Sequence, residues 1–145
     1  MLPGFNSDGN LPEGIHLATE DEVFLRFATT SARRQWLGEQ LRSLLALAKS
    51  TGQLSRVFLW GSFVTSKEVP NDVDVLLVMT ADFAIEILPA QCYVLFDYVQ
   101  ARLRFQGDVF WTKASIDEAV LQQWLDTYQT GKDFKRRGIV EVVVS

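Results

Sequence analysis

The feature that most constrains this 145-residue chain is the near-continuous apolar run VDVLLVM at residues 73–79. An exposed strand alternates apolar and polar residues, whereas an unbroken apolar run predicts a strand that is covered on both faces. Such a strand needs helical layers on each side of a sheet. We therefore expect residues 73–79 to lie in the centre of a sheet and to organise the fold.

Three other segments have the character of strands. RVFLW at residues 56–60 is rich in residues that favour β-structure, GDVFWTK follows at residues 107–113, and the tail GKDFKRRGIVEVVVS is first basic and then strand-like. Residues 61–72, between the first two strands, are expected to form a loop with at most one turn of helix. We expect Trp60 and Trp111, which fall within strands, to belong to the core.

Four helices are expected between these strands. Thr19 and Glu22 have the spacing of a capping box, which predicts a short helix over residues 20–28. Ser31 can cap a second helix over residues 32–51, which ends near Gly52, buries a face that includes Trp36, and exposes Arg33 and Arg34. Residues 82–105 have a helical pattern that Pro89 must break or kink. A last helix is expected to begin at Ser115 or Asp117 and to end at about Tyr128, with Trp124 on its apolar side.

This order of elements predicts an α+β or α/β fold, with helices packed on a small mixed sheet. The length suits one domain. Residues 1–18 contain two prolines and three glycines and are expected to be irregular, so the domain is expected to span residues 19–145.

Composition excludes several classes of function. The net charge of −4 argues against a general binder of DNA, and no apolar stretch is long enough to span a membrane. The N-terminus has no signal-peptide pattern, so the cytoplasm is the expected compartment. Cys92 and His16 are the only residues of their kinds, which excludes an internal disulfide and a His-rich metal site. We expect Cys92 to be buried and His16 to be structural or incidental.

Asp72 and Asp74 stand at the entrance to the apolar strand. Side chains of a strand alternate between its faces, so the two carboxylates are expected to point the same way. Two neighbouring carboxylates repel each other unless a cation lies between them, and Mg²⁺ prefers such oxygen ligands. The alternative is that Asp72 ends a turn and that Asp74 is a solvated strand residue.

Gly61 and Ser62 directly follow the first strand. Glycine lets the backbone approach a phosphate closely, backbone N–H groups can form an anion nest there, and a serine hydroxyl adds a donor. A tight turn that binds no ligand is the alternative reading of this pair.

The combined pattern of strand, Gly61-Ser62, nine residues, Asp72-x-Asp74 and apolar strand resembles the nucleotidyltransferase superfamily that includes DNA polymerase β. It is most similar to the minimal nucleotidyltransferases, which are small bacterial proteins. The resemblance implies a third carboxylate on a later neighbouring strand. Asp108, which opens GDVFW, is the candidate, whereas Asp97 is expected to lie within a helix and Asp82 to cap one. The segments LPEGIHLATEDEVFLRF and RRGIVEV also look like those of an uncharacterised group of small bacterial proteins with this domain.

The resemblance implies an enzyme that transfers a nucleoside monophosphate from an NTP, with ATP as the expected donor, to a hydroxyl of a protein, an RNA or a small molecule. Asp72, Asp74 and Asp108 would be the catalytic residues and the ligands of a two-metal Mg²⁺ site. Gly61, Ser62 and Lys67 would bind the nucleotide's phosphates. A dimer or a complex with a partner protein is expected, with a toxin–antitoxin pair as one setting.

One departure from the family pattern leaves alternatives open. Family members often carry Arg-Gly soon after the Gly-Ser turn, whereas this chain has FVTSK. Phosphate charge would have to be neutralised by Lys67, by Mg²⁺ or by residues elsewhere, such as the basic cluster Lys132, Lys135, Arg136 and Arg137. That cluster can also be a solvated tail and Lys67 a solvated loop residue. The chain can then be a catalytically degenerate module that binds a nucleotide or a partner protein, or an interaction domain whose aspartates lie on the surface.

Overall fold

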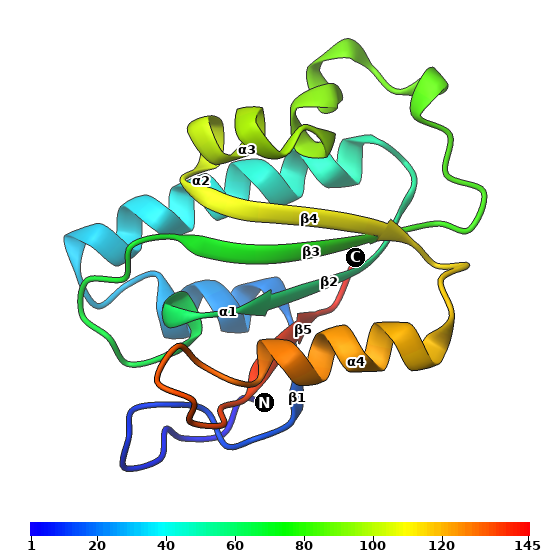
Figure 1. The fold of residues 1–145 in the computed structure, drawn as a ribbon. Helices are drawn as coiled ribbons and strands as arrows, with labels where there is room; N and C mark the ends of the chain where they lie inside the picture. The colour runs from blue at the N-terminus through cyan, green and yellow to red at the C-terminus, as the bar shows by residue number, and fades with distance from the viewer.

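Five strands form one mixed sheet in the order β1–β5–β2–β3–β4 in the computed structural model, which describes residues 1–145 (Figure 1). β2 pairs antiparallel with β3 and with β5, whereas β3 and β4 are parallel, as are β1 and β5. The strands are β1 Ile15–Ala18, β2 Leu54–Trp60, β3 Val73–Met79, β4 Gly107–Lys113 and β5 Ile139–Val142.

Helices cover both faces of this sheet, which confirms the predicted α+β class. Residues of α1, α2 and α3 share the larger hydrophobic core with one face, and α4 packs on the other face around a smaller core. The helices are α1 Glu20–Phe27, α2 Ala32–Ser50, α3 Tyr98–Phe105 and α4 Glu118–Tyr128, with 3₁₀ turns η1 Ser62–Val64, η2 Ile85–Ile87 and η3 Ala90–Phe96.

β3 is buried on both faces, as its apolar run predicts. Val75 and Leu77 point into the larger core, whereas Leu76 and Val78 join the smaller core beneath α4. Because side chains alternate along a strand, Asp74 lies on the same face as Leu76. The acidic residue therefore continues the face that α4 covers, at the start of the strand.

The predicted helix ends are present. Thr19 accepts a hydrogen bond from the Glu22 backbone N–H, and the Glu22 side chain accepts one from the Thr19 N–H, which completes a capping box. Ser31 caps α2 by accepting from Arg34 N–H. Gly52 has a φ of +69°, the left-handed conformation expected just after a helix.

The prediction that residues 1–18 are irregular was wrong for β1. Ile15–Ala18 forms an edge strand that pairs in parallel with β5, and Leu2 and Leu11 belong to the larger core. The folded domain therefore begins well before residue 19. β1 is short and mostly exposed, and its partner lies near the end of the chain, so no local alternation marks it as a strand.

Residues 82–105 are not one long helix. η2 and η3 precede α3, which begins only at Tyr98. Pro89 has no N–H to donate and disfavours helical geometry at Leu88, so the segment turns instead of continuing. Asp97 is consequently the N-cap of α3, where its side chain accepts a hydrogen bond from Gln100 N–H, and not a mid-helix residue.

The roles predicted for several side chains on α2 and in the strands were also wrong. Arg34 is 2% exposed, not on a solvated face, whereas Trp36 is 41% exposed. Trp111 is exposed, whereas Trp60 is partly buried and packs against the smaller core, as predicted. Cys92 is fully buried, as expected.

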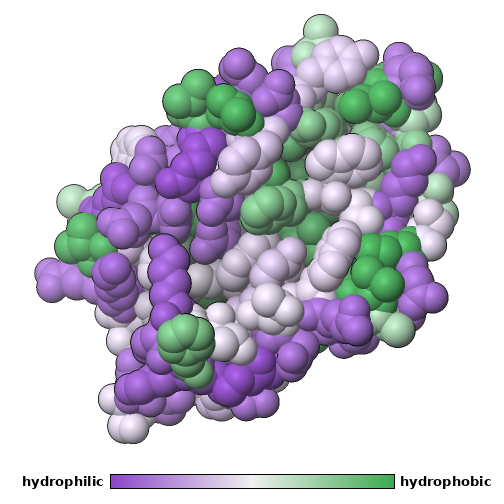
Figure 2. Space-filling model, viewed as in Figure 1, coloured by the Kyte–Doolittle hydropathy of each residue, from purple (hydrophilic) through white to green (hydrophobic).

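The surface on the α4 side is mixed in character. Hydrophilic residues dominate the view in Figure 2, and a hollow lined by pale and green residues crosses its centre. None of the helices combines the length and the apolarity that a membrane span requires.

Candidate active site

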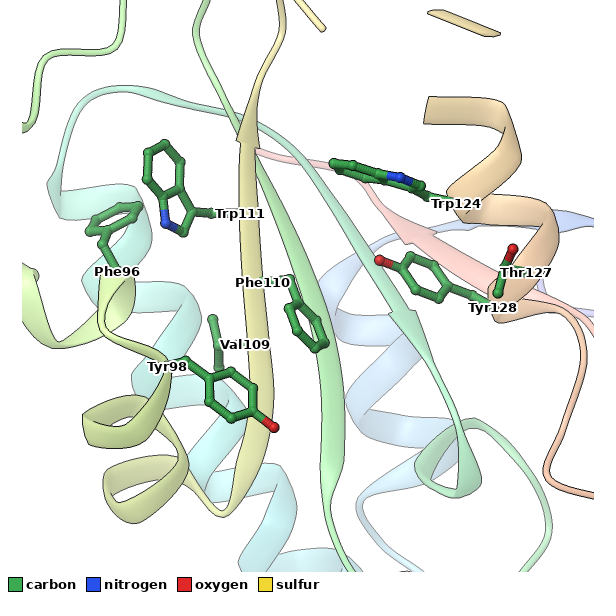
Figure 3. Close-up of a pocket in the computed structure, with 8 residues that line it drawn as sticks. All are labelled: Phe96, Tyr98, Val109, Phe110, Trp111, Trp124, Thr127 and Tyr128. Carbon is green, nitrogen blue, oxygen red and sulfur yellow. The ribbon is translucent and has the colours of Figure 1, made fainter. Parts of the chain in front are cut away.

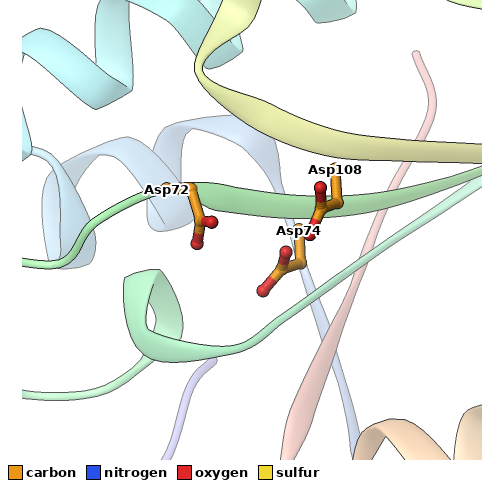
Figure 4. Close-up of side chains that lie close together, drawn as sticks. All are labelled: Asp72, Asp74 and Asp108. Carbon is orange, nitrogen blue, oxygen red and sulfur yellow. The ribbon is translucent and has the colours of Figure 1, made fainter. Parts of the chain in front are cut away.

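Three aspartates meet where β3 and β4 begin. Asp74 and Asp108 are direct partners in the parallel pairing of these strands, and Asp72 precedes β3 by one residue. Each carboxylate offers an oxygen within 4.8 Å of the oxygens offered by the others (Figure 4). The structure thus brings together the three aspartates that the sequence analysis singled out, and it leaves Asp97 and Asp82 outside the cluster.

Gly61 is needed for the close approach of β2 to this cluster. It has a φ of +81°, and a Cβ atom placed there would lie 2.1 Å from Asp74 Oδ2. Any other residue would be strained and would push the Asp74 carboxylate aside. The glycine of the Gly-Ser pair therefore has a steric role towards Asp74 in addition to any role in phosphate binding.

The environment of Asp74 disfavours its charge in the metal-free protein. Burial, followed by the negative charges of Asp72 and Asp108, raises the pKa of Asp74 to about 7, and Lys132 offsets this only in part. A group of carboxylates that repel one another in this way attracts a cation. All-oxygen donors at this spacing are the ligands that Mg²⁺ prefers, so these residues fit the metal that the sequence suggested.

A cationic side chain already contacts the cluster. Arg102 Nη1 donates to Asp72 Oδ2 at 3.1 Å and to Asp108 Oδ1 at 2.9 Å. Tyr98, one turn earlier on α3, donates its hydroxyl hydrogen to Asp108 Oδ1 at 2.6 Å, which raises the pKa of the Tyr98 phenol. Both contacts draw on lone pairs that a metal ion at Asp108 would use.

Replacing Arg102 by Gln is expected to strengthen Mg²⁺ binding several-fold, because the guanidinium no longer competes for Asp72 and Asp108. The same change should lower the melting temperature of the metal-free protein by a few degrees, since the carboxylates lose their counter-ion. Titration calorimetry with MgCl₂ measures the first effect. Arg104→Gln, on an exposed arginine of the same helix, is the control. Weaker Mg²⁺ binding in Arg102→Gln would contradict the competition.

A polar pocket of about 550 Å³ opens on the Asp72 and Asp74 side of the cluster. Gly61, Ser62 and Lys67, the residues predicted to bind phosphates, all line it. The loop after α4 also lines the pocket and contributes three further cations, Lys132, Lys135 and Arg137, together with the acidic residue Asp133.

The cations of this pocket differ in whether an acidic partner neutralises them. Lys135 is paired with Asp8 at 3.1 Å, whereas Lys67, Lys132 and Arg137 make no salt bridge. Arg136 does not line the pocket and is paired with Asp126 and Glu13. Three cations without an acidic partner around a polar cavity favour a polyanionic ligand such as a triphosphate.

Arg34 holds the loop that carries Ser62 and Lys67. Its guanidinium donates to the backbone carbonyls of Phe27, Ser62, Phe63, Thr65 and Lys67, at 2.5–3.3 Å. Burial lowers the pKa of Arg34 from its usual value, and no carboxylate compensates. The side chain therefore serves as an internal scaffold for the irregular loop between β2 and β3.

Sequence reasoning missed Tyr98, Arg102 and Arg34 as parts of this site. Tyr98 and Arg102 are four residues apart, so they face the same way on a helix that runs into β4, and this spacing was a usable signal. Nothing in the sequence marked Arg34, because its acceptors are backbone carbonyls from a distant loop. His16 takes no part in the site; its Nε2 lies 2.6 Å from the Pro12 carbonyl oxygen.

Comparisons with known proteins place the chain without naming an activity. The model of a family of unknown function, DUF6932, matches residues 3–143. No curated protein and no solved structure matches the chain. Since the match covers nearly the whole chain, the protein belongs to the DUF6932 family.

Proposed function

We propose that this protein is a Mg²⁺-dependent nucleotidyltransferase that transfers a nucleoside monophosphate from an NTP to a hydroxyl acceptor. The observation that carries the proposal is the position of the three clustered carboxylates beside a pocket with three unpaired cations. Carboxylates alone would suit a simple cation site. Their combination with three cations that have no acidic partner suits a metal-bound polyphosphate.

In the proposed reaction the acceptor oxygen forms a bond to the α-phosphorus, and the bond from that phosphorus to the bridging oxygen breaks. Pyrophosphate leaves, and the hydroxyl proton passes to Asp108. Mg²⁺ held by Asp72, Asp74 and Asp108 would neutralise the charge on the transferring phosphoryl group. Ser62, Lys67 and the loop with Lys132 would hold the β- and γ-phosphates.

The loop after α4 supplies an answer to the missing Arg-Gly. Lys132 and Arg137 line the same polar pocket as the Gly-Ser turn, so they would provide the positive charge that the resembled family places directly after that turn. ATP is the expected donor, and a cytoplasmic location suits an NTP substrate. The acceptor is a hydroxyl of a protein, an RNA or a small molecule, and a partner toxin is the acceptor that the resemblance suggests.

A second candidate function is a nucleotide-binding module without catalysis. The contact of Arg102 with both Asp72 and Asp108 favours it, because a permanent guanidinium there would exclude a metal from Asp108. The two candidates differ in turnover: the module would bind Mg²⁺-NTP without releasing pyrophosphate.

Thermal melts with Mg²⁺ and each NTP in turn test the binding that both candidates require. A ligand at 100 times its Kd stabilises a protein by about 2.7 kcal/mol, so the wild-type melting temperature should rise by roughly 5–10 °C. The rise should need both metal and nucleotide, and it should disappear in Asp72→Asn/Asp74→Asn. The control Asp82→Asn/Glu86→Gln removes two carboxylates that the structure places elsewhere on the surface. A wild-type melt that no combination shifts would refute the proposal.

Lys132→Gln is expected to weaken binding of Mg²⁺-ATP by roughly 10-fold, because it removes one charge-assisted contact to phosphate. Lys113→Gln removes an exposed lysine at the far end of β4 and serves as the matched control. Calorimetric titration of both variants provides the comparison. Equal affinities would show that the loop after α4 does not contact the phosphates.

A further inference from the structure

An uncharged aromatic groove lies beside the acidic cluster. It has a volume of about 550 Å³, within the range of small-molecule sites, and is formed by β4, α4 and the segment that leads into α3 (Figure 3). Its lining includes no charged residue and consists of Phe96, Tyr98, Val109, Phe110, Trp111, Trp124, Thr127 and Tyr128. In Figure 3 the rings of Phe110, Tyr128 and Trp124 lie across the space between β4 and α4.

The groove is connected to the three aspartates by specific residues. Phe110 is two residues beyond Asp108 on β4, so its ring lies on the same face, roughly 7 Å further along the strand. The Tyr98 hydroxyl contacts Asp108 directly. Tyr128 lines both the groove and the polar pocket. The groove is thus continuous with the site proposed for the phosphates.

The two cavities match the two chemically different ends of one ligand. The polar pocket has unpaired cations and suits a polyanion, whereas the aromatic groove has no charge and suits a flat, uncharged group. A nucleoside triphosphate has a polyanionic end and a planar heterocycle. The end of an RNA chain is a poorer match than a nucleoside triphosphate, because it would bring phosphates into the groove, where no cation could neutralise them.

We propose that the aromatic groove receives the base of the nucleotide, which stacks on its rings, while the polar pocket holds the triphosphate. This assignment rests on the proposed function and extends it. Phe110, Trp111 and Trp124 are each 37–40% exposed, so part of each ring is open to a ligand. The ring centroids of Trp60 and Tyr128 are 3.7 Å apart, with an interplanar angle of 6°. Those of Trp60 and Phe110 are 6.1 Å apart, with an interplanar angle of 18°. The rings beside the aspartates are therefore already nearly parallel.

The chemistry of the groove also predicts weak discrimination between bases. Its lining offers hydroxyl and indole N–H groups but no carboxylate, amide side chain or guanidinium that could read a base's hydrogen-bonding edge in a bidentate manner. Stacking accepts every base because every base has an aromatic face. All four NTPs should therefore bind, and the purines should bind more tightly because they offer a larger face.

The test compares Mg²⁺-ATP with Mg²⁺-tripolyphosphate, which has the phosphates and lacks the base. Calorimetry is run on the wild type and on Phe110→Leu and Trp124→Leu, which keep apolar bulk without an aromatic ring. Trp36→Ala is the control, because Trp36 is an exposed tryptophan that does not line the groove. The wild type should bind ATP more tightly than tripolyphosphate. The two groove variants should lose roughly 5- to 100-fold in ATP affinity and keep their tripolyphosphate affinity, and Trp36→Ala should change neither.

The possible failures are distinguishable. Equal wild-type affinities for ATP and tripolyphosphate, or unchanged ATP affinity in both groove variants, would overturn the base assignment while leaving a phosphate site, and the groove would then be assigned to an apolar acceptor. Binding of neither ligand would overturn the proposed function together with the base assignment. Melting curves of the variants without ligand verify that each is folded.

Discussion

Asp74→Asn is expected to abolish Mg²⁺-dependent nucleotide binding and to reduce transfer by about 10³-fold or more. Asp74 lies between the other two acidic positions, next to Asp108 in the β3–β4 pairing and two residues from Asp72. An amide cannot supply the negative charge that a divalent ion needs. The loss should therefore be of function and not of fold.

The same variant should be more stable than the wild type when no metal is present. The pKa of Asp74 is about 7 in the folded protein, against about 4 for an unfolded aspartate. The unfolded state therefore releases this proton at lower pH, and the folded wild type loses stability as the pH rises from about 4 to above 7, by at most on the order of 3–4 kcal/mol. Asparagine does not ionise, so the free energy of unfolding of the variant does not decline in this way as the pH rises.

Urea unfolding from pH 4 to pH 8 in EDTA measures this difference. The two proteins should be similar near pH 4, and the variant should become progressively more stable above pH 5. Asp117→Asn, at the exposed N-cap of α4, provides a control without a clustered carboxylate. A variant that is less stable than the wild type at pH 8 would show that the Asp74 charge supports the fold, which contradicts a site built for a cation.

Arg34→Met is expected to destabilise the protein by about 3–5 kcal/mol and to remove phosphate binding. Methionine can fill much of the volume, but it removes the guanidinium donor from five buried or part-buried carbonyl acceptors, of which the Ser62 carbonyl also accepts from Thr65. Four of these carbonyls, all except that of Phe27, belong to the loop that follows Gly61 and connects β2 to β3. The loop should therefore lose its fixed shape even where the sheet survives.

Denaturant unfolding together with hydrogen exchange tests this second prediction. The amide groups of residues 62–67 should exchange much faster in Arg34→Met than in the wild type, while those of β3 should change in proportion to global stability. Arg42→Met is the control, since Arg42 is an exposed arginine of the same helix. Unchanged exchange in the loop would mean that other contacts hold it.

Much of the fold followed from local sequence signals. β3 and β4 have the predicted bounds, because an apolar run defines β3 and Gly107 marks the start of β4. α1 begins at the capping box that the spacing of Thr19 and Glu22 predicts. Asp108 could be chosen as a partner for Asp72 and Asp74 because the family resemblance implies a third carboxylate on a later neighbouring strand, and Asp108 opens such a strand.

The rest of the fold depended on contacts between distant segments. β1 becomes a strand only through pairing with β5, and Arg34 is buried only because a loop far along the chain offers its carbonyls. Arg102 and the aromatic groove arise from the placement of α3 and α4 on either side of β4. Periodicity describes which face of an element is apolar, but it does not say which neighbour that face meets.

The most direct test of the proposed metal and nucleotide site is a crystal structure with Mn²⁺ and an ATP analogue whose α–β bridge is a methylene group, which blocks transfer. Anomalous scattering locates the manganese independently of the rest of the density. We expect manganese bound by Asp72, Asp74 and Asp108, with Arg102 displaced and the triphosphate in the pocket that Lys132 lines. If saturating Mn²⁺ and analogue give no anomalous peak at the three aspartates, and Arg102 still bridges Asp72 and Asp108, the proposed metal site is contradicted.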